Sequence, residues 1–218
     1  MAKPTATLSE PDTLSDTPKQ LLDAAERLFA EHGIDSVSIR EIVRASGQSN
    51  LSAAHYHFGT REALVGALVE RRMRTINDLR HQRLDALAAS GHDSEVQAII
   101  RTTVCVLADV VRSEPWGPDY VRITAAANFS PKVQLHLLVD PRHMTGLVRC
   151  TQMLRALLPD LPQKMFRERI RIVNNETVFS IARWVQVHGP VTASNARPFN
   201  AMVRNLADFL AAGLVAAK

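Results

Sequence analysis

Helix start and stop signals between residues 17 and 68 constrain the fold of this 218-residue chain more than any other feature. Ser38 is followed three residues later by Glu41, a capping box in which each side chain can satisfy a backbone N–H of the other residue. Gly33 precedes this start and Gly47 follows it, and glycine readily adopts the left-handed conformation that ends many helices. The spacing predicts one helix ending near Gly33, a second over about 39–46, and a tight turn after it.

The first helix has its own start signal. Thr17 is the expected N-cap, Pro18 suits the first helical position, and Gln20 completes a capping-box spacing. Apolar residues then recur at helical spacing and predict one buried face: Leu21, Leu22, Ala24, Ala25, Leu28 and Phe29. Helix, glycine-containing turn and helix is the helix-turn-helix pattern, although many helical proteins contain such corners.

A third, short helix is predicted over 51–57. At 1.5 Å per residue it is about 10 Å long, which suits the major groove of DNA. Asn pairs with adenine, Ser and His bind base edges or phosphates, Tyr donates to phosphate, and an Ala methyl can contact thymine. The candidates for its outward face are Asn50, Ser52, Ala53, His55, Tyr56 and His57.

The turn after this helix predicts a phosphate contact. Thr60 is the expected N-cap of a fourth helix, whose free backbone N–H groups can bind phosphate, and Arg61 lies in its first turn. His55 and His57 are spaced like a metal-binding pair, but no third ligand is near in sequence, so we expect no metal. The alternative for both histidines is an ordinary surface or half-buried position.

A series of short motifs matches one known domain in order and nearly in spacing: Ala24-Ala25, Leu28-Phe29, Gly33, Ser38-Ile39-Arg40-Glu41-Ile42, Ala45, Gly47, Tyr56-His57-Phe58 and Arg61-Glu62-Ala63-Leu64. On these residues the chain resembles the DNA-binding domain of the tetracycline-repressor (TetR) family of bacterial regulators. The more common Gly-Val-Ser of the turn is replaced by a stretch one residue longer, Gly47 to Asn50. The resemblance implies that the unit binds DNA through its third helix and the adjoining turns. The residues assigned to DNA contact are Ser38, Arg40, Ser49, Asn50, Ser52, Ala53, His55, Tyr56, His57, Thr60 and Arg61.

The rest of the chain predicts a larger helical body without a catalytic motif. A helix over about 60–89 joins the two parts, and a nearly all-apolar stretch over 95–111 predicts a helix at the centre of the body. Shorter helices are expected over about 119–129 and 142–158. The long amphipathic helices over about 163–188 and 196–217 can complete a monomer core or form half of a four-helix dimer seam. The resemblance favours the seam, because a dimer lets two recognition helices read a palindrome.

The expected fold is therefore all-α, with a three-helix helix-turn-helix domain joined by a long helix to a ligand-binding and dimerisation domain. The predicted divisions are a disordered tail over 1–16, the DNA-binding domain over 17–75 and the C-terminal domain over 76–218. Candidate lining residues for a ligand pocket in the body are Trp116, Tyr120, Arg122, Phe129, Met144, Met153, Asn175 and Phe179. Further candidate polar anchors are His136, His143 and Arg149. The alternative is that the apolar members are ordinary core and the polar ones surface.

Composition permits this interpretation without demanding it. The formal charge of +4 is only mildly basic, and the two cysteines, Cys105 and Cys150, have no metal-binding or disulfide-framework spacing. The sequence has no apolar signal core and no apolar run of membrane-spanning length, which favours a cytoplasmic protein that does not contact a membrane.

The sequence and the resemblance together predict a homodimeric, ligand-responsive transcriptional regulator, with a repressor implied by the family. Its expected partners are a palindromic DNA operator and a small, largely apolar effector of unknown identity, and no cofactor is expected. Two alternatives remain: a helical enzyme, although the common hydrolase, zinc-protease and phosphate-loop motifs are absent, and a helical adaptor whose helix-turn-helix meets protein.

Overall fold

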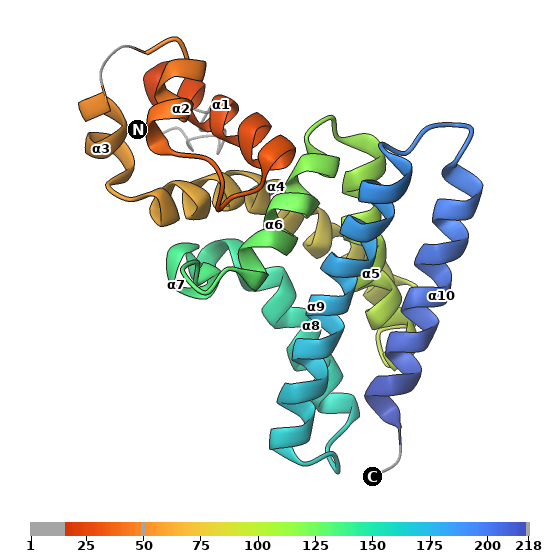
Figure 1. The fold of residues 1–218 in the computed structure, drawn as a ribbon. Helices are drawn as coiled ribbons and strands as arrows, with labels where there is room; N and C mark the ends of the chain where they lie inside the picture. Colours follow the sequence, from red (N-terminus) through yellow and green to blue (C-terminus); the bar gives the residue numbers. More distant parts are fainter. Residues whose placement is uncertain (1–15, 49–50, 217–218) are drawn as a thin grey trace, which may run out of the picture.

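A computed structural model describes residues 16–48 and 51–216, except for the side chains of Asp16, Leu51 and Ala53. The described residues form an all-α fold, as predicted (Figure 1). The elements are α1 (Asp16–His32), α2 (Ile39–Ala45), α3 (Leu51–Phe58), α4 (Arg61–Ala89), α5 (Val96–Ser113), α6 (Gly117–Phe129), α7 (Leu135–Leu138), the 3-10 helix η1 (Pro141–Met144), α8 (Thr145–Leu157), α9 (Gln163–His188) and α10 (Ala196–Val215).

Two of the three predicted helix N-caps in the N-terminal unit are present in the structure. Glu41 N donates to Ser38 Oγ at 3.3 Å, and Ser38 N donates to Glu41 Oε2 at 2.7 Å, which completes the capping box of α2. Thr60 Oγ1 accepts from Ala63 N at 3.1 Å and caps α4. The expected cap at Thr17 is wrong, because α1 already begins at Asp16 and Thr17 lies inside it.

The helices of this unit share one small core. Leu21, Phe29, Ile42, Ala54 and Leu64 are buried, and α1 packs against α2, α3 and α4. Ala54 is the inward residue of α3, so the opposite side of this short helix faces solvent. The core thus holds α3 at one end of the molecule (Figure 1).

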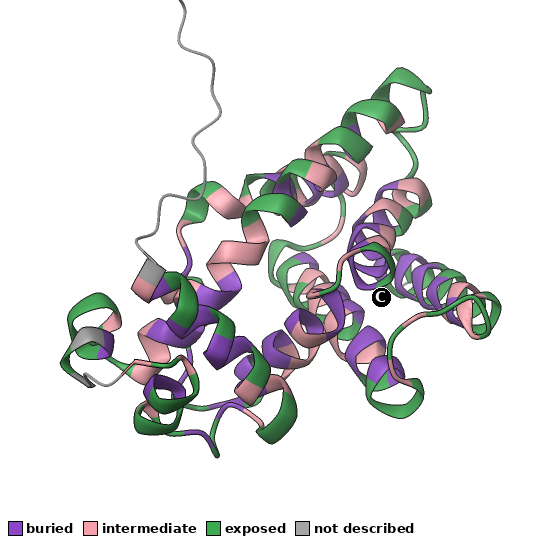
Figure 2. Cartoon of the chain, turned by 90° about the horizontal axis from the view of Figure 1, so that it is seen from above, coloured by how far each residue is buried: buried purple, intermediate pink, exposed green. Residues whose placement is uncertain are grey.

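The body is built around α5, as its apolar sequence predicts. α5 packs against α4, α6, α8, α9 and α10, and its residues Ile99, Ile100 and Val104 have no exposed surface. Buried residues lie on the faces that the helices turn toward one another (Figure 2). The last two helices, α9 and α10, run antiparallel side by side (Figure 1). No helix in the described part of the chain is both long enough and apolar enough to span a membrane.

The segment before α8 differs from the sequence expectation. The helix expected over 142–158 is divided into the 3-10 turn η1 and α8, which begins at Thr145. Pro141 lacks an N–H and Asp140 Oδ1 accepts from Arg142 N at 2.8 Å, so the first turn is capped as a separate unit.

The two halves of the molecule share α4. It passes through the predicted boundary between residues 75 and 76 without a break, and it contacts α1 and α3 at one end and α5, α7 and α8 further along. α1 also packs directly on α6. Of the predicted N-terminal tail, residues 1–15 lie outside the described part, while Asp16 belongs to α1.

Candidate functional site

The outward side of α3 carries polar and aromatic side chains. Ser52, His55, Tyr56 and His57 are exposed, and Tyr56 is the most exposed of the large hydrophobic residues that protrude from the described chain, at 86%. The rings of Tyr56 and His57 meet edge to face with centroids 5.1 Å apart. A protruding tyrosine on a short helix is suited to contact DNA along a groove.

His55 is oriented by the backbone at the end of its own helix. Its Nδ1 lies 3.1 Å from the carbonyl oxygen of Gly59. Because a carbonyl only accepts, Nδ1 is the donor in this contact, and in the corresponding neutral tautomer Nε2 is an acceptor. Such an acceptor can receive a hydrogen bond from the amino group of adenine or cytosine in the major groove.

α2 packs against α3 and presents Arg40 near its own start. Its side chain is exposed, and none of the ion pairs found among residues 16–48 and 51–216 includes it. Ser38 is also exposed, but its hydroxyl is engaged with Glu41. Arg40 therefore supplies a free positive charge on the same end of the molecule as Tyr56.

Arg61, assigned to DNA from the sequence, is half-buried and paired within the protein. Its Nη1 donates to the Asp35 carbonyl at 3.2 Å, and its Nη2 lies 3.4 Å from Asp35 Oδ1. Only 20% of its side chain is exposed. The guanidinium thus ties the α1–α2 connection to the start of α4. Thr60 is exposed, and its hydroxyl is used as the cap.

Three of the residues assigned to DNA cannot be placed. Ser49 and Asn50 lie outside the described residues, as does the side chain of Ala53. Their assignment remains a prediction from the resemblance.

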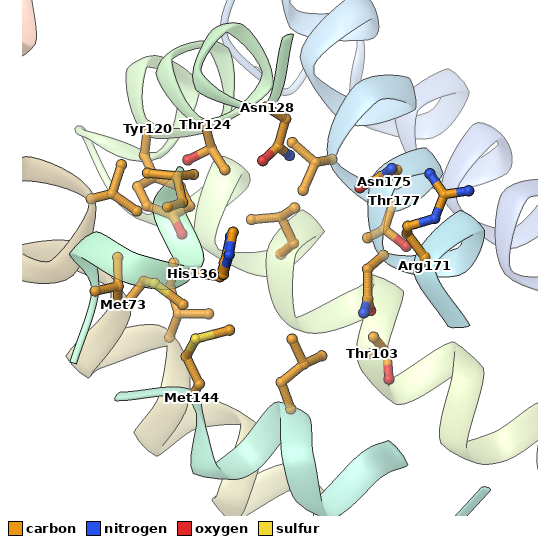
Figure 3. Close-up of a pocket in the computed structure, with 18 of the residues that line it drawn as sticks. Met73, Thr103, Tyr120, Thr124, Asn128, His136, Met144, Arg171, Asn175 and Thr177 are labelled. Carbon is orange, nitrogen blue, oxygen red and sulfur yellow. The ribbon is translucent and has the colours of Figure 1, made fainter. Parts of the chain in front are cut away.

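A second candidate site is a cavity of about 560 Å³ inside the body. Its walls come from α4, α5, α6, α8 and α9 and from the segment 133–139 that contains α7. Figure 3 shows Tyr120, Thr124 and Asn128 of α6 on one side and Asn175 and Thr177 of α9 on another. Most of the surface is apolar, from residues including Val69, Met73, Ile76, Leu107, Val139, Met144, Leu147 and Val178. A mainly apolar cavity of this size with a few polar groups is typical of a small-molecule site.

The cavity brings together three of the eight predicted lining residues, Tyr120, Met144 and Asn175, and the candidate anchor His136. Burial raises the pKa of Tyr120, so its hydroxyl keeps its proton at neutral pH and can donate.

The other five lining candidates lie elsewhere. Trp116 packs under the guanidinium of Arg72, with the Arg72 carbon 4.8 Å from the ring centroid, and Arg122 Nη1 lies 3.6 Å from Asp119 Oδ1. Phe129 and Phe179 stack on each other with centroids 4.4 Å apart, and Met153 is a partly buried residue packed against the core. Their spacing in the sequence does not distinguish a pocket wall from a helix contact.

Two further anchor candidates are engaged with acidic residues outside the cavity lining. His143 Nδ1 lies 3.1 Å from Glu70 Oε1, and Arg149 Nη1 donates to Asp85 Oδ1 at 2.6 Å.

The sequence analysis missed Arg80, a cavity residue on α4. Its exposed fraction is 8%, and its Nε has no hydrogen-bond partner. A signal was present, since Arg80 continues the buried stripe of Ile76, Asn77 and Leu84 at helical spacing. A charged residue on the core face of a helix is uncommon and marks a position to examine.

Two family models match the chain and together cover both halves. The model described as bacterial regulatory proteins, tetR family, matches residues 21–68. The model described as tetracyclin repressor-like, C-terminal domain, matches residues 101–213. The chain belongs to the TetR family.

Individual relatives match different shares of the chain. An HTH-type transcriptional repressor of Mycobacterium tuberculosis is 40% identical over 57 residues, 26% of this chain and 30% of that protein. The HTH-type transcriptional regulator BetI of Rhizobium meliloti is 30% identical over 146 residues, 65% of this chain and 66% of BetI. The aligned part thus spans less than a third of the first relative and about two thirds of the second. The transcriptional regulator FadR of Bacillus subtilis, solved in complex with stearoyl-CoA, shares the fold with a TM-score of 0.58 at 13% identity, covering 89% of this chain and 98% of FadR.

Proposed function

We propose that this TetR-family chain is a DNA-binding transcriptional regulator that represses its target genes and is released from DNA by a small, largely apolar effector. The observation that carries the proposal is the placement of two surfaces on one helix. α4 packs against α3, which presents Tyr56, and the same α4 supplies Val69, Met73, Ile76 and Arg80 to the cavity wall. A ligand that prefers one position of α4 therefore changes the position of α3.

The assigned DNA surface is α3 together with the start of α2. His55 offers an acceptor to a base edge, while Tyr56 and Arg40 suit phosphate contacts. The identity with the mycobacterial repressor lies in a segment of 57 residues, a length suited to one DNA-binding unit. A role on bacterial DNA also implies that the protein acts in the cytoplasm.

The assigned dimer surface is formed by α9 and α10. A groove between these helices is bordered by Phe179, Val187 and Phe209, and Phe209 and Val187 are 72% and 55% exposed. Large apolar side chains at the surface of two adjacent long helices favour burial against a second copy. A dimer of this kind would place two α3 helices for a palindromic operator.

The effector is assigned to the body cavity. FadR, which shares this fold, was solved in complex with stearoyl-CoA, so a protein of this architecture binds a ligand with a long apolar part. Release requires only that the effector bind the conformer with displaced α3 helices more tightly than the operator-binding conformer.

The proposal is tested by a mobility shift with the promoter DNA that flanks the gene. We expect the dimer to shift this fragment and to leave a scrambled fragment of equal length unshifted. A protein that acts as an enzyme or as a protein-binding adaptor would shift neither fragment. Addition of a cavity-binding effector is expected to reverse the shift.

A further inference from the structure

Arg80 is a buried cation without a counter-ion. Its exposed fraction is 8%, its Nε has no hydrogen-bond partner, and none of the ion pairs in the described part of the chain includes it. Its Cβ and Cδ lie close to Gly146 of α8, so the stem of the side chain is confined between two helices. A charge removed from water and left unpaired is costly, so most buried charges in proteins are paired.

The titratable groups that act on Arg80 do not neutralise it. These groups are Cys150 and Tyr120, and burial raises the pKa of both, so both are uncharged at neutral pH. Burial lowers the pKa of Arg80 itself, but an arginine starts so high that it keeps its proton at neutral pH. A positive charge therefore remains at the edge of the cavity.

A second polar group lines the same cavity. The hydroxyl of Thr124 on α6 is buried, its nearest polar side chain is that of Tyr120, and Figure 3 shows the two side by side at the cavity wall. The remaining surface is mainly apolar. One cavity thus combines an unpaired guanidinium, a buried hydroxyl and an apolar wall.

We propose that the effector carries an anionic group, most simply a carboxylate, which pairs with Arg80 and accepts from Thr124 while its apolar body fills the rest of the cavity. This inference rests on the proposed function, because it names the chemical class of the molecule assigned to that cavity. A guanidinium matches a carboxylate with two parallel hydrogen bonds, and the low dielectric of the cavity strengthens the pairing. The anion would bind a residue of α4, the helix that also holds α3.

The test compares acids with neutral molecules of the same shape on the full-length protein at one ionic strength. The probes are decanoate with decanol, and naphthoate with naphthamide, and binding is measured by calorimetry and by the shift in melting temperature. We expect at least one acid to bind about ten- to a hundred-fold more tightly than its neutral partner. Equal affinity within both pairs would overturn the proposal, as would equal stabilisation by sodium chloride alone.

Variants then locate the anion. Arg80→Met is expected to abolish the preference for the acid, and Thr124→Val to reduce it a few-fold. Arg74→Met removes an exposed arginine from the same helix and is the matched control, which should keep the full preference. Arg171→Met tests the exposed arginine at the cavity (Figure 3). If the preference is lost in Arg171→Met and kept in Arg80→Met, the assignment to Arg80 is wrong.

The ligand-free protein gives an independent readout. Because Arg80→Met replaces an unpaired buried charge by an apolar side chain of similar length, its melting temperature without ligand should equal or exceed that of the wild type. A clear decrease in the melting temperature would show that Arg80 has a stabilising partner in the ligand-free protein. The comparison of acidic and neutral probes uses the wild type, so it stays valid even if this variant fails to fold. The mobility shift distinguishes failure of the proposed function from failure of the anion proposal. If the protein shifts its promoter fragment and the neutral probes release it, the proposed function stands and only the anionic nature of the effector is refuted.

Discussion

Arg72 of α4 donates two hydrogen bonds to the carboxylate of Glu26 on α1, from Nε to Oε1 at 3.0 Å and from Nη2 to Oε2 at 2.6 Å. Only 18% and 9% of the two side chains are exposed. The guanidinium also lies over the ring of Trp116 at the start of α6. This cluster joins the DNA-binding unit to two helices that line the cavity, α4 and α6.

Removing one partner of this pair should destabilise the protein. Glu26→Gln leaves the half-buried Arg72 without its counter-charge, and we expect the free energy of unfolding to fall by about 3 kcal/mol. The measurement is chemical denaturation followed by circular dichroism. Arg71 and Asp23 form the matched control between the same two helices, at 2.6 Å but with Asp23 51% exposed. Asp23→Asn should cost less than about 1 kcal/mol. Equal losses in the two variants would show that burial does not distinguish the pairs.

Loss of the Tyr56 hydroxyl should weaken operator binding without affecting the fold. Tyr56→Phe removes one phosphate donor from each subunit of the proposed dimer, and we expect roughly ten- to thirty-fold weaker binding in a mobility shift. His55→Ala should also weaken binding. The other tyrosine of the chain provides the control: Tyr120→Phe lies in the cavity and should leave operator affinity unchanged. Unchanged affinity in both Tyr56→Phe and His55→Ala would refute the assignment of α3.

The cap of α2 should make stability depend on acid pH. Hydrogen bonds from the Ser38 backbone and hydroxyl lower the pKa of Glu41 in the folded state. Because the pKa of this carboxyl is lower in the folded than in the unfolded state, its ionised form stabilises the fold at every pH above the unfolded-state pKa. This contribution is lost as the pH falls through the folded-state pKa. Ser38→Ala should cost about 1 kcal/mol at neutral pH through loss of the N-cap. The difference from the wild type should shrink as denaturation is repeated below about pH 4, the ordinary range of a glutamate. A pH-independent difference would exclude the contribution from Glu41.

Two helical glycines should respond oppositely to the same substitution. A Cβ at Gly117, where α6 starts, would lie 2.3 Å from the Val110 carbonyl oxygen, so Gly117→Ala must displace backbone and should destabilise by roughly 2 kcal/mol. A Cβ at Gly213 in α10 meets nothing within 4 Å. Gly213→Ala should therefore raise stability by up to about 1 kcal/mol through helix propensity. Thermal unfolding of the two variants measures both effects, and the same sign in both would contradict the packing described at the α5–α6 turn.

The proposed dimer should depend on the exposed apolar side chains of the last two helices. Phe209→Glu places a charge in the α9–α10 groove, and we expect the protein to become monomeric and to lose operator binding. Val148→Glu is the control, because Val148 is an exposed apolar residue on α8, at 50%. Sedimentation velocity measures the oligomeric state, and a dimer that persists in Phe209→Glu would exclude this surface.

Local signals predict the helices better than the sites. Ser38 and Thr60 cap their helices as expected, because a cap depends on residues three apart. The cavity instead depends on side chains from five helices and a loop, and sequence spacing within one helix does not reveal which of them meet. At the DNA-binding end, the sequence likewise does not reveal that Arg61, in the first turn of α4, contacts Asp35, which lies 26 residues earlier. The phosphate contact assigned to Arg61 stays a prediction. The sequence could have predicted that Arg80 is a charged residue on the buried face of its helix. Only the structure shows that no acidic residue in its described part pairs with Arg80.

The unbroken course of α4 sets the scale of the movement that the proposed effector would have to produce. Arg80 and Arg61 are separated by about 28 Å along the helix axis at 1.5 Å per residue. A tilt of about 5° at the cavity would then move the far end by about 2.5 Å, close to the length of a hydrogen bond. Because both ends belong to one continuous helix, the proposed release would need only a small rearrangement of the cavity to misalign α3 with its groove.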